Sequence, residues 1–192
     1  VPDIDRTSYL IVLGGNPLVS NGSLATAPDF PGRLRALKKR GGKLVVIDPR
    51  RTQTAKLANE YISIKPGGDI FLLLAMACVL YEEKIIQPGR LVDYINGLEL
   101  IQREVSAFTP ERVQNACGVE AHVIRRLARE LAAAPSGAVY GRMGVSTVRF
   151  GTAANWMIEQ CSRRGNEAEG PPPHFGGYRP KIVTISSISA YT

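Results

Sequence analysis

Two short apolar runs, each followed directly by residues suited to ligand binding, constrain the fold of this chain most. Tyr9–Leu13 is followed by Gly-Gly-Asn-Pro at 14–17. Lys43–Ile47 is followed by Asp-Pro-Arg-Arg at 48–51. Runs that are apolar throughout are typical of strands buried on both faces of a parallel sheet, and ligands of such sheets bind beyond the carboxyl ends of the strands. The pattern predicts a nucleotide-bearing cofactor, with glycines near its phosphates and an acid near its ribose or base.

The order of the predicted elements is that of a three-layer, doubly wound α/β fold with a mostly parallel, Rossmann-like sheet and a helix-rich second half. Strands are expected at 9–13, 43–47, 61–64 and 138–140. Helices are expected at 33–40, 52–58, 70–82, 91–95, 98–108, 109–118, 124–131 and 152–160. We expect Asp69 to cap the helix at 70–82 through its side-chain oxygen. Trp156 and Met157 are expected in the core.

Length and composition indicate a globular chain with one main domain. The 192 residues are 44% hydrophobic and 21% charged, which is ordinary for a globular protein. Residues 1–160 are expected to form a cofactor-binding α/β domain, and 161–192 a non-matching, irregular tail. The net charge of +7 favours polyanionic ligands. No aromatic-rich basic stripe accompanies that charge, so no nucleic-acid partner is expected.

Other sequence features bear on the setting of the chain and on metal binding. The longest apolar stretch, at 70–81, is too short to span a bilayer, so no membrane span is expected. The three cysteines are far apart and form no C-x-x-C motif, which fits a reduced, cytoplasmic setting. His122 and His174 are the only histidines, so no histidine-based metal site is predicted.

The candidate cofactor-binding residues follow the ends of the four predicted strands. They are Gly14, Gly15, Asn16 and Pro17; Asp48, Pro49, Arg50 and Thr52; Pro66, Gly67, Gly68 and Asp69; and Gly141, Met143 and Gly144. Glycine has no Cβ, so backbone amides can approach phosphate oxygens. A carboxylate can accept hydrogen bonds from ribose hydroxyls or from N1–H and N2–H₂ of guanine, and an arginine fork suits phosphate.

Each of these segments also has a purely structural interpretation. Residues 14–17 fit a plain turn between a strand and a helix, and Asp48 fits a helix N-cap beside solvated arginines. Asp69 fits a helix cap, and the glycines at 141–144 fit close packing of a helix on a strand. The G-x-G-x-x-G spacing is absent. No nucleophile–base pair, carboxylate dyad or P-loop is present, so no catalytic residue and no metal ligand is predicted.

Taken together, the motifs resemble the molybdopterin oxidoreductase family, especially its formate-dehydrogenase-like branch. The similar motifs are Gly-x-Asn-Pro at 14–17, Asp-Pro-Arg-x-x-x-Thr-Ala at 48–55, Pro-Gly-x-Asp at 66–69, Phe-Thr-Pro-Glu-Arg-Val at 108–113 and Gly-Arg-Met-Gly-Val at 141–145. The resemblance covers residues 9–160. It implies a domain that helps to hold a bis(molybdopterin guanine dinucleotide) cofactor on molybdenum or tungsten.

The resemblance also assigns roles to individual residues. It places Gly15, Asn16 and Pro17 at the pyrophosphate or pterin, Asp48 and Arg50 at the guanosine ribose and phosphate, and Asp69 at the guanine. The iron–sulfur region, the metal ligand and the C-terminal domain of the family have no counterpart in this sequence. We therefore expect a fragment of a larger oxidoreductase, inactive alone. Its expected partners are the rest of the parent enzyme and an electron-transfer subunit or domain, and formate oxidation is the favoured parent reaction.

Two other interpretations remain open from the residues themselves. The same strand ends could belong to a stand-alone nucleotide-binding or regulatory module, without redox chemistry, that binds GTP, NAD or coenzyme A. The chain could also be a fragment that folds without binding any ligand. A preference for adenine nucleotides would count against the cofactor-binding domain, and failure of any nucleotide to shift the melting point would favour the fragment that binds no ligand.

Overall fold

The computed structural model describes residues 4–23, 27–86 and 97–162. Within these ranges, four strands form one parallel sheet in the order β3-β2-β1-β4. The strands are β1 (Tyr9–Leu13), β2 (Lys43–Ile47), β3 (Glu60–Ile62) and β4 (Gly137–Gly141). The chain steps outward from β1 to β2 and β3, and then returns to pair β4 with the other side of β1. The winding therefore reverses between β1 and β4, which is the topological switch point of the sheet.

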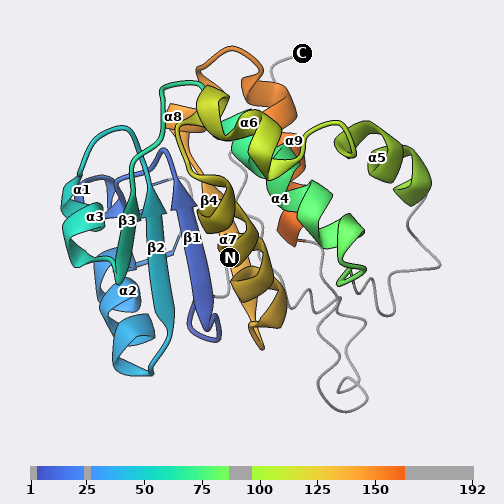
Figure 1. Ribbon diagram of the computed structural model, residues 1–192. Helices are drawn as coiled ribbons and strands as arrows, with labels where there is room; N and C mark the ends of the chain where they lie inside the picture. Colours follow the sequence, from blue (N-terminus) through green and yellow to red (C-terminus); the bar gives the residue numbers. More distant parts are fainter. Residues whose placement is uncertain (1–3, 24–26, 87–96, 163–192) are drawn as a thin grey trace.

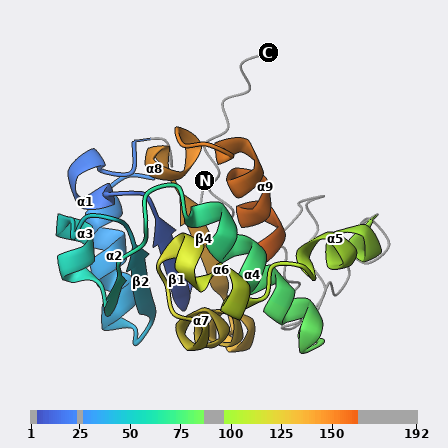
Figure 2. The same ribbon diagram turned by 45° about the horizontal axis from the view of Figure 1, so that its top comes forward.

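Helices cover both faces of this sheet and form two outer layers (Figures 1 and 2). One face carries α1 (Pro17–Ser20), α2 (Phe30–Lys39) and α3 (Gln53–Leu57). The other carries α4 (Asp69–Glu82), α6 (Pro110–Cys117), α7 (Ala121–Ala133) and α9 (Gly151–Ser162). The helix α5 (Leu98–Val105) lies beyond α4, and α8 (Met143–Ser146) follows β4. This arrangement confirms the predicted three-layer, doubly wound α/β fold with a helix-rich second half.

The strand β1 is apolar throughout, and β2 is apolar after Lys43, because both faces of these strands are covered. Ile11 and Leu13 belong to the core beneath α4, α7 and α9, whereas Leu10 and Val12 belong to the core beneath α2. Neighbouring residues of a strand point to opposite faces, so one five-residue run supplies both cores. The helix α4 is buried along most of its length, which explains its continuous apolar sequence. No helix in the described ranges is both long enough and apolar enough to cross a bilayer.

Several element boundaries differ from those predicted. Helix α2 begins at Phe30 rather than at residue 33, because the Asp29 carboxylate accepts a hydrogen bond from the Gly32 amide at 3.0 Å and caps the helix. Strand β3 covers 60–62 instead of 61–64, and the four-residue helices α1 and α8 were not predicted. The predicted helix at 91–95 and residues 163–192 of the predicted tail lie outside the described residues.

Two side-chain predictions are wrong. Asp69 is the first residue of α4 rather than its cap, since Gly68 occupies the N-cap position and no side chain caps this helix end. Trp156 is 45% exposed, whereas its neighbour Met157 is buried as predicted. These two residues follow one another on a helix, so they point in different directions and cannot both face the same core.

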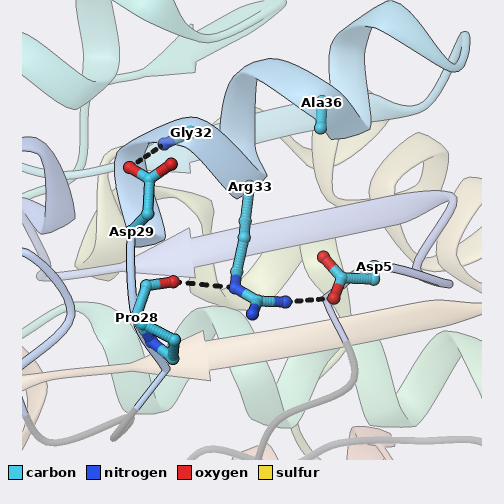
Figure 3. A pocket seen from close by; sticks show the side chains of 6 residues that line it. All are labelled: Asp5, Pro28, Asp29, Gly32, Arg33 and Ala36. Atoms are coloured by element: carbon cyan, nitrogen blue, oxygen red, sulfur yellow. Dashed lines mark hydrogen bonds and ion pairs between the residues drawn. The ribbon is translucent and has the colours of Figure 1, made fainter.

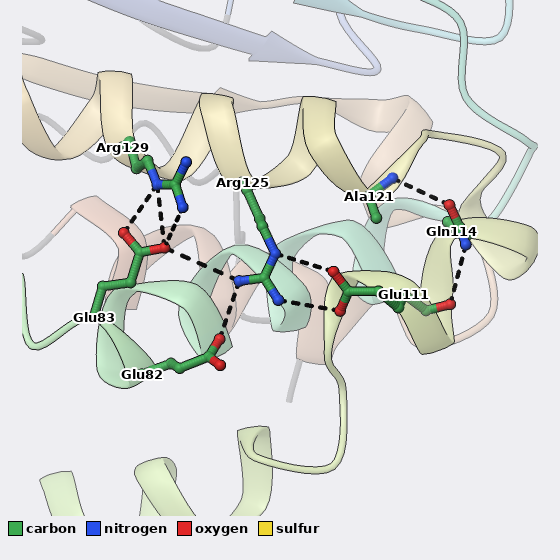
Figure 4. A network of polar contacts seen from close by, with 7 residues as sticks. All are labelled: Glu82, Glu83, Glu111, Gln114, Ala121, Arg125 and Arg129. Atoms are coloured by element: carbon green, nitrogen blue, oxygen red, sulfur yellow. Dashed lines mark hydrogen bonds and ion pairs between the residues drawn. The ribbon is translucent and has the colours of Figure 1, made fainter.

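Ion pairs tie the helices of one outer layer to each other (Figure 4). Arg125 of α7 donates through Nε and Nη2 to the two carboxylate oxygens of Glu111 in α6, at 3.0 and 3.1 Å. Its Nη1 donates to Glu82 of α4 at 3.1 Å. Arg129 pairs with Glu83 at the end of α4. The network links α4, α6 and α7 on the side away from the sheet, and every charge in it has a partner of opposite sign.

Candidate functional site

Two glycine-containing turns touch where β1 and β4 end. The Gly14 amide donates to the Ile47 carbonyl at 3.1 Å, and the Gly144 amide donates to the Gly14 carbonyl at 3.1 Å. A Cβ atom on Gly14 would lie 2.8 Å from the Gly144 carbonyl carbon, and Gly14 has a φ of 55°. Only glycine fits this conformation and this close approach without strain. These two glycines therefore bring the ends of β1, β2 and β4 together and shape the carboxyl edge of the sheet.

Asn16 holds the turn after β1 against the start of α3. Its Oδ1 accepts hydrogen bonds from the Thr54 hydroxyl at 2.7 Å and from the Thr54 amide at 3.2 Å. The Thr54 hydroxyl in turn accepts from the Leu18 amide at 3.2 Å. Pro17 is the first residue of α1, a position that suits its fixed φ. The amide oxygen of Asn16 is thus used within the protein, and the turn is fixed relative to the end of β2.

The segment after β2 presents a half-buried carboxylate in a fixed turn. Asp48 Oδ1 accepts from the Arg50 amide at 2.8 Å, and the Tyr61 hydroxyl donates to the Asp48 carbonyl at 3.0 Å. Thr52 caps α3, because its hydroxyl accepts from the Ala55 amide at 3.1 Å. Arg50 is exposed. Asp48 is therefore held in place at the carboxyl end of β2, next to a surface arginine.

Asp69 is a buried acid close to Asp48. It is 4% exposed. Burial, together with the negative charge of Asp48, raises the pKa of Asp69 from its ordinary value of 3.8 to about 6. Burial is the larger cause of this shift, and the charge of Asp48 at the end of β2 adds a smaller contribution. The preceding turn packs against α6, since a Cβ atom on Gly68 would lie 2.8 Å from the Cys117 Cα.

One residue at this edge was missed by the sequence reasoning. Arg142 lies between the predicted residues Gly141 and Met143, and it is 8% exposed. Its Nη2 donates to the Ser23 hydroxyl at 3.2 Å, but its buried Nη1 has no hydrogen-bond partner in the described part of the chain. The Tyr140 hydroxyl is also buried without a partner there. The available signal was the position of Arg142 directly after a buried strand, inside a motif already selected.

The structure gathers most of the predicted residues at one edge of the sheet, although their contacts with a ligand stay predictions. Gly14 contacts Gly144, and Asp48 is coupled to Asp69. Asn16 and Thr52 bond to other parts of the protein, and Pro66 is exposed. In the ranges that the structure describes, no group of three or more His, Cys, Asp or Glu side chains is placed to hold a metal ion.

A surface hollow on α2 is separate from these residues (Figure 3). Its lining residues are Asp5, Pro28, Asp29, Gly32, Arg33 and Ala36. Arg33 pairs with Asp5 and donates through Nε to the Pro28 carbonyl at 2.9 Å. The polar groups of the hollow therefore bind one another, and none of its residues is a candidate for cofactor binding.

Comparisons with known proteins relate the chain to parts of larger enzymes. Formate dehydrogenase H from Escherichia coli (strain K12) is 35% identical over 146 residues, which are 76% of this chain and 20% of that protein. The molybdopterin-containing subunit of thiosulfate reductase from Salmonella typhimurium (strain LT2) is 34% identical over 137 residues, or 71% of this chain and 17% of that subunit. The chain thus spans about a fifth of the length of these relatives. No family model matches it.

A solved structure has the same fold over most of the chain. The acetylene hydratase from Pelobacter acetylenicus superposes with a TM-score of 0.72 at 22% sequence identity. The superposition covers 87% of this chain and 23% of the hydratase chain. The described α/β unit therefore recurs as one part of a much longer polypeptide.

Proposed function

Because the chain is homologous to part of the molybdopterin oxidoreductases, we propose that it is the domain that holds the guanine dinucleotide portion of a molybdopterin cofactor in a larger enzyme. In the complete enzyme, the metal of that cofactor supplies a two-electron oxidation or reduction, and formate oxidation is the favoured reaction. The residues of this chain bind and orient the nucleotide part. The partners are then the rest of the parent enzyme and an electron-transfer subunit or domain with an iron–sulfur cluster.

The pair of acids after β2 and β3 is the observation that carries this proposal. A buried carboxylate is unfavourable unless hydrogen-bond donors or an opposite charge compensate it. Guanine presents N1–H and N2–H₂ side by side, so Asp69 can accept from both. Adenine presents an acceptor, N1, at the corresponding edge and would repel the carboxylate. We assign Asp48, whose Oδ1 accepts from the Arg50 amide, to the ribose hydroxyls.

The glycine-containing turns fit the phosphate part of the same ligand. Gly14 and Gly144 pack backbone against backbone, and no side chain separates the turns after β1 and β4. The amides of Gly14 and Gly144 already donate to the Ile47 and Gly14 carbonyls, so we assign the phosphate to the other backbone amides of these two turns. The surface guanidinium of Arg50 adds a positive charge near Asp48. The polar groups at the carboxyl edge of the sheet therefore suit a nucleoside diphosphate. Acids would accept hydrogen bonds from the base and ribose, and backbone amides and Arg50 would donate to the phosphates.

The proposal is tested by the response of the 192-residue chain to purified nucleotides. We expect GDP to raise the melting temperature more than ADP at equal concentration. Asp69→Asn should remove about 1–3 kcal/mol of the preference for guanine, since hydrogen bonds to a charged acceptor are lost. Asp48→Ala should weaken the binding of both GDP and ADP, and it should change the stability of the ligand-free chain little. Glu99→Gln, an exposed acid on α5, is the control that changes the same charge elsewhere.

Two results would count against the proposal. Equal stabilisation by GDP and ADP would favour a general nucleotide-binding module instead. An unchanged preference for guanine in Asp69→Asn, with normal folding, would remove Asp69 from the base site.

A further inference from the structure

An arginine side chain is buried at the topological switch point of the sheet. Arg142 directly follows β4, and its amide donates to the Leu13 carbonyl at the end of β1, at 3.1 Å. It therefore lies where the carboxyl ends of β1 and β4 meet. Ligands of doubly wound sheets bind in the crevice at this point, because the flanking helices leave it on opposite faces.

The guanidinium of Arg142 has no acid beside it in the described ranges. Its only hydrogen bond there is the one from Nη2 to the Ser23 hydroxyl at 3.2 Å, and Nη1 is buried without a partner. By contrast, Arg125, Arg126 and Arg129 each pair with one or more glutamates. A buried charge without a counter-charge is costly to fold. Ser23 is exposed, so the guanidinium lies just beneath the surface.

A second unpartnered donor lies nearby. The Tyr140 hydroxyl is buried and has no hydrogen-bond partner in the part of the chain that the structure describes. Tyr140 and Arg142 are two residues apart at the end of β4, which places them on the same side of the strand. Burial raises the pKa of Tyr140, and the positive charge of Arg142 acts against this shift, as expected for neighbouring groups. A buried water could satisfy one of these donors, but it would not neutralise the guanidinium.

The turn after β1 leaves room for the arginine. A Cβ atom on Gly15 would lie 3.1 Å from Arg142 Cγ, so the Gly15 backbone rests on the aliphatic part of this side chain. We propose that Arg142 and Tyr140 bind a phosphate or diphosphate group next to this turn. The identification of that group as the diphosphate of the guanine dinucleotide rests on the proposed function. The need for an anion rests on the Arg142 guanidinium, which has no counter-charge within the described ranges.

The affinity of the 192-residue chain for inorganic pyrophosphate, measured by titration calorimetry at constant ionic strength, tests this site. Arg142→Met keeps the aliphatic stem against Gly15, and it should weaken binding about tenfold to a hundredfold because a charged hydrogen bond is lost. Tyr140→Phe should weaken it about twofold to tenfold. Arg129→Met removes the same charge from an exposed ion pair, and it should change the affinity less than twofold. No binding to the wild-type chain, or equal binding to Arg142→Met, would overturn the proposal.

The stability of the ligand-free chain separates a binding role from a structural one. Arg142→Met should melt at the wild-type temperature or above it, because the variant buries no unpaired charge. A markedly lower melting temperature would show that Arg142 holds the fold together and would overturn the proposal. The same titration with inorganic phosphate tests the size of the bound group. Weaker binding of phosphate than of pyrophosphate would identify a diphosphate site. Equal affinities would restrict the site to a single phosphate and overturn its assignment to a diphosphate.

The preference of the chain for GDP over ADP tests the proposed function separately from the anion site at Arg142. If pyrophosphate binding depends on Arg142 while GDP and ADP bind equally, the anion site stands and the guanine role of Asp69 fails. If GDP is preferred over ADP while Arg142→Met binds pyrophosphate normally, the anion site fails and the proposed function stands.

Discussion

The two edges of the sheet differ in how their charged side chains are partnered. At the amino edge, a cluster of polar side chains joins the starts of β1, β2 and β3 to α7; we call it the amino-edge cluster. Its members are Tyr9, Lys43, Glu60, Arg126 and Glu130. The Tyr9 hydroxyl and Lys43 Nζ donate to the same Glu130 oxygen at 2.8 and 2.7 Å. Arg126 Nη1 donates to both Glu60 and Glu130 at 3.0 Å.

At the carboxyl edge the charges are not balanced in this way. Asp69 is buried close to a second acid, Asp48, and its pKa is raised. Arg142 is buried, and its Nη1 has no partner within the described ranges. Hydrogen bonds that satisfy every member stabilise a fold, whereas buried charges that lack partners reduce its stability and are characteristic of binding sites. The comparison indicates that the amino edge serves folding and the carboxyl edge serves a ligand.

The largest effect is expected where the turns after β1 and β4 touch. Gly14→Ala should lower the free energy of unfolding by about 3–4 kcal/mol, since it adds a strained positive φ to a backbone clash. Gly41→Ala is the matched control, because Gly41 also has a positive φ but has no heavy atom within 4 Å of its Cβ position. It should lose only about 1 kcal/mol. Equal losses in urea denaturation would show that the turns after β1 and β4 do not form this contact.

The next largest effect is a pH-dependent gain in stability when the buried carboxylate of Asp69 is removed. The pKa of Asp69 is higher in the folded chain, so stability is lost as the pH rises from about 4 to about 6, and the full loss persists above pH 6. Asp69→Asn should therefore stabilise the ligand-free chain by about 2–3 kcal/mol at pH 7.5 and much less at pH 4. Denaturant unfolding at the two pH values measures this difference. A loss of stability at pH 7.5 would assign Asp69 to the folding of α4.

At the amino edge, removal of an acidic side chain should lower the stability of the chain rather than raise it. Glu130→Ala should cost about 2 kcal/mol, because Tyr9 and Lys43 lose a charged acceptor. Burial acts to raise the pKa of Glu130, but hydrogen bonds from Lys43, Tyr9 and Arg126 outweigh it and keep this pKa below its usual value. The contribution of Glu130 is then present at neutral pH and lost as the pH falls below about 4. The control Glu104→Ala, at an exposed pair, should stay within about 0.5 kcal/mol.

The smallest effect tests the coupling of the two acids. Asp48→Asn keeps the oxygen that accepts from the Arg50 amide, so stability should change by less than about 0.5 kcal/mol. Removal of the negative charge should lower the pKa of Asp69 from about 6 toward its ordinary value. The carboxyl carbon of Asp69, followed by NMR as a function of pH, reports this shift. An unchanged pKa would mean that burial alone raises it.

Much of the fold was predictable because the apolar runs are sharply bounded. The strands β1 and β2 have the predicted bounds, and α4 coincides with the continuous apolar stretch after Gly68. The four-residue helices α1 and α8 carry too few residues for a periodic pattern. The start of α2 depends on the cap formed by Asp29, a contact that polarity alone does not reveal. The exposure of Trp156 depends on which face of α9 meets α4, which is a property of the assembled core.

The candidate site was predictable in position but not in chemical detail. Strand ends located the glycines and both acids, because the carboxyl ends of parallel strands meet at one edge. The sequence did not reveal that Asn16 bonds to Thr54, or that Asp69 is buried beside another acid. The position of Arg142 directly after a strand was visible in the sequence, but the lack of a partner for its Nη1 within the described ranges was not. Whether a charge has a partner is decided by tertiary contacts between distant segments, such as Arg142 and Ser23.

The most direct test of a ligand-binding carboxyl edge is amide hydrogen exchange of the 192-residue chain with and without GDP. We expect slower exchange at residues 14–16, 48–52, 67–70 and 142–145 when GDP is present. Exchange at the amino edge, around residues 8–9, 43 and 60, should not change. Protection confined to the amino edge, or no protection of the carboxyl edge at saturating GDP, would contradict it.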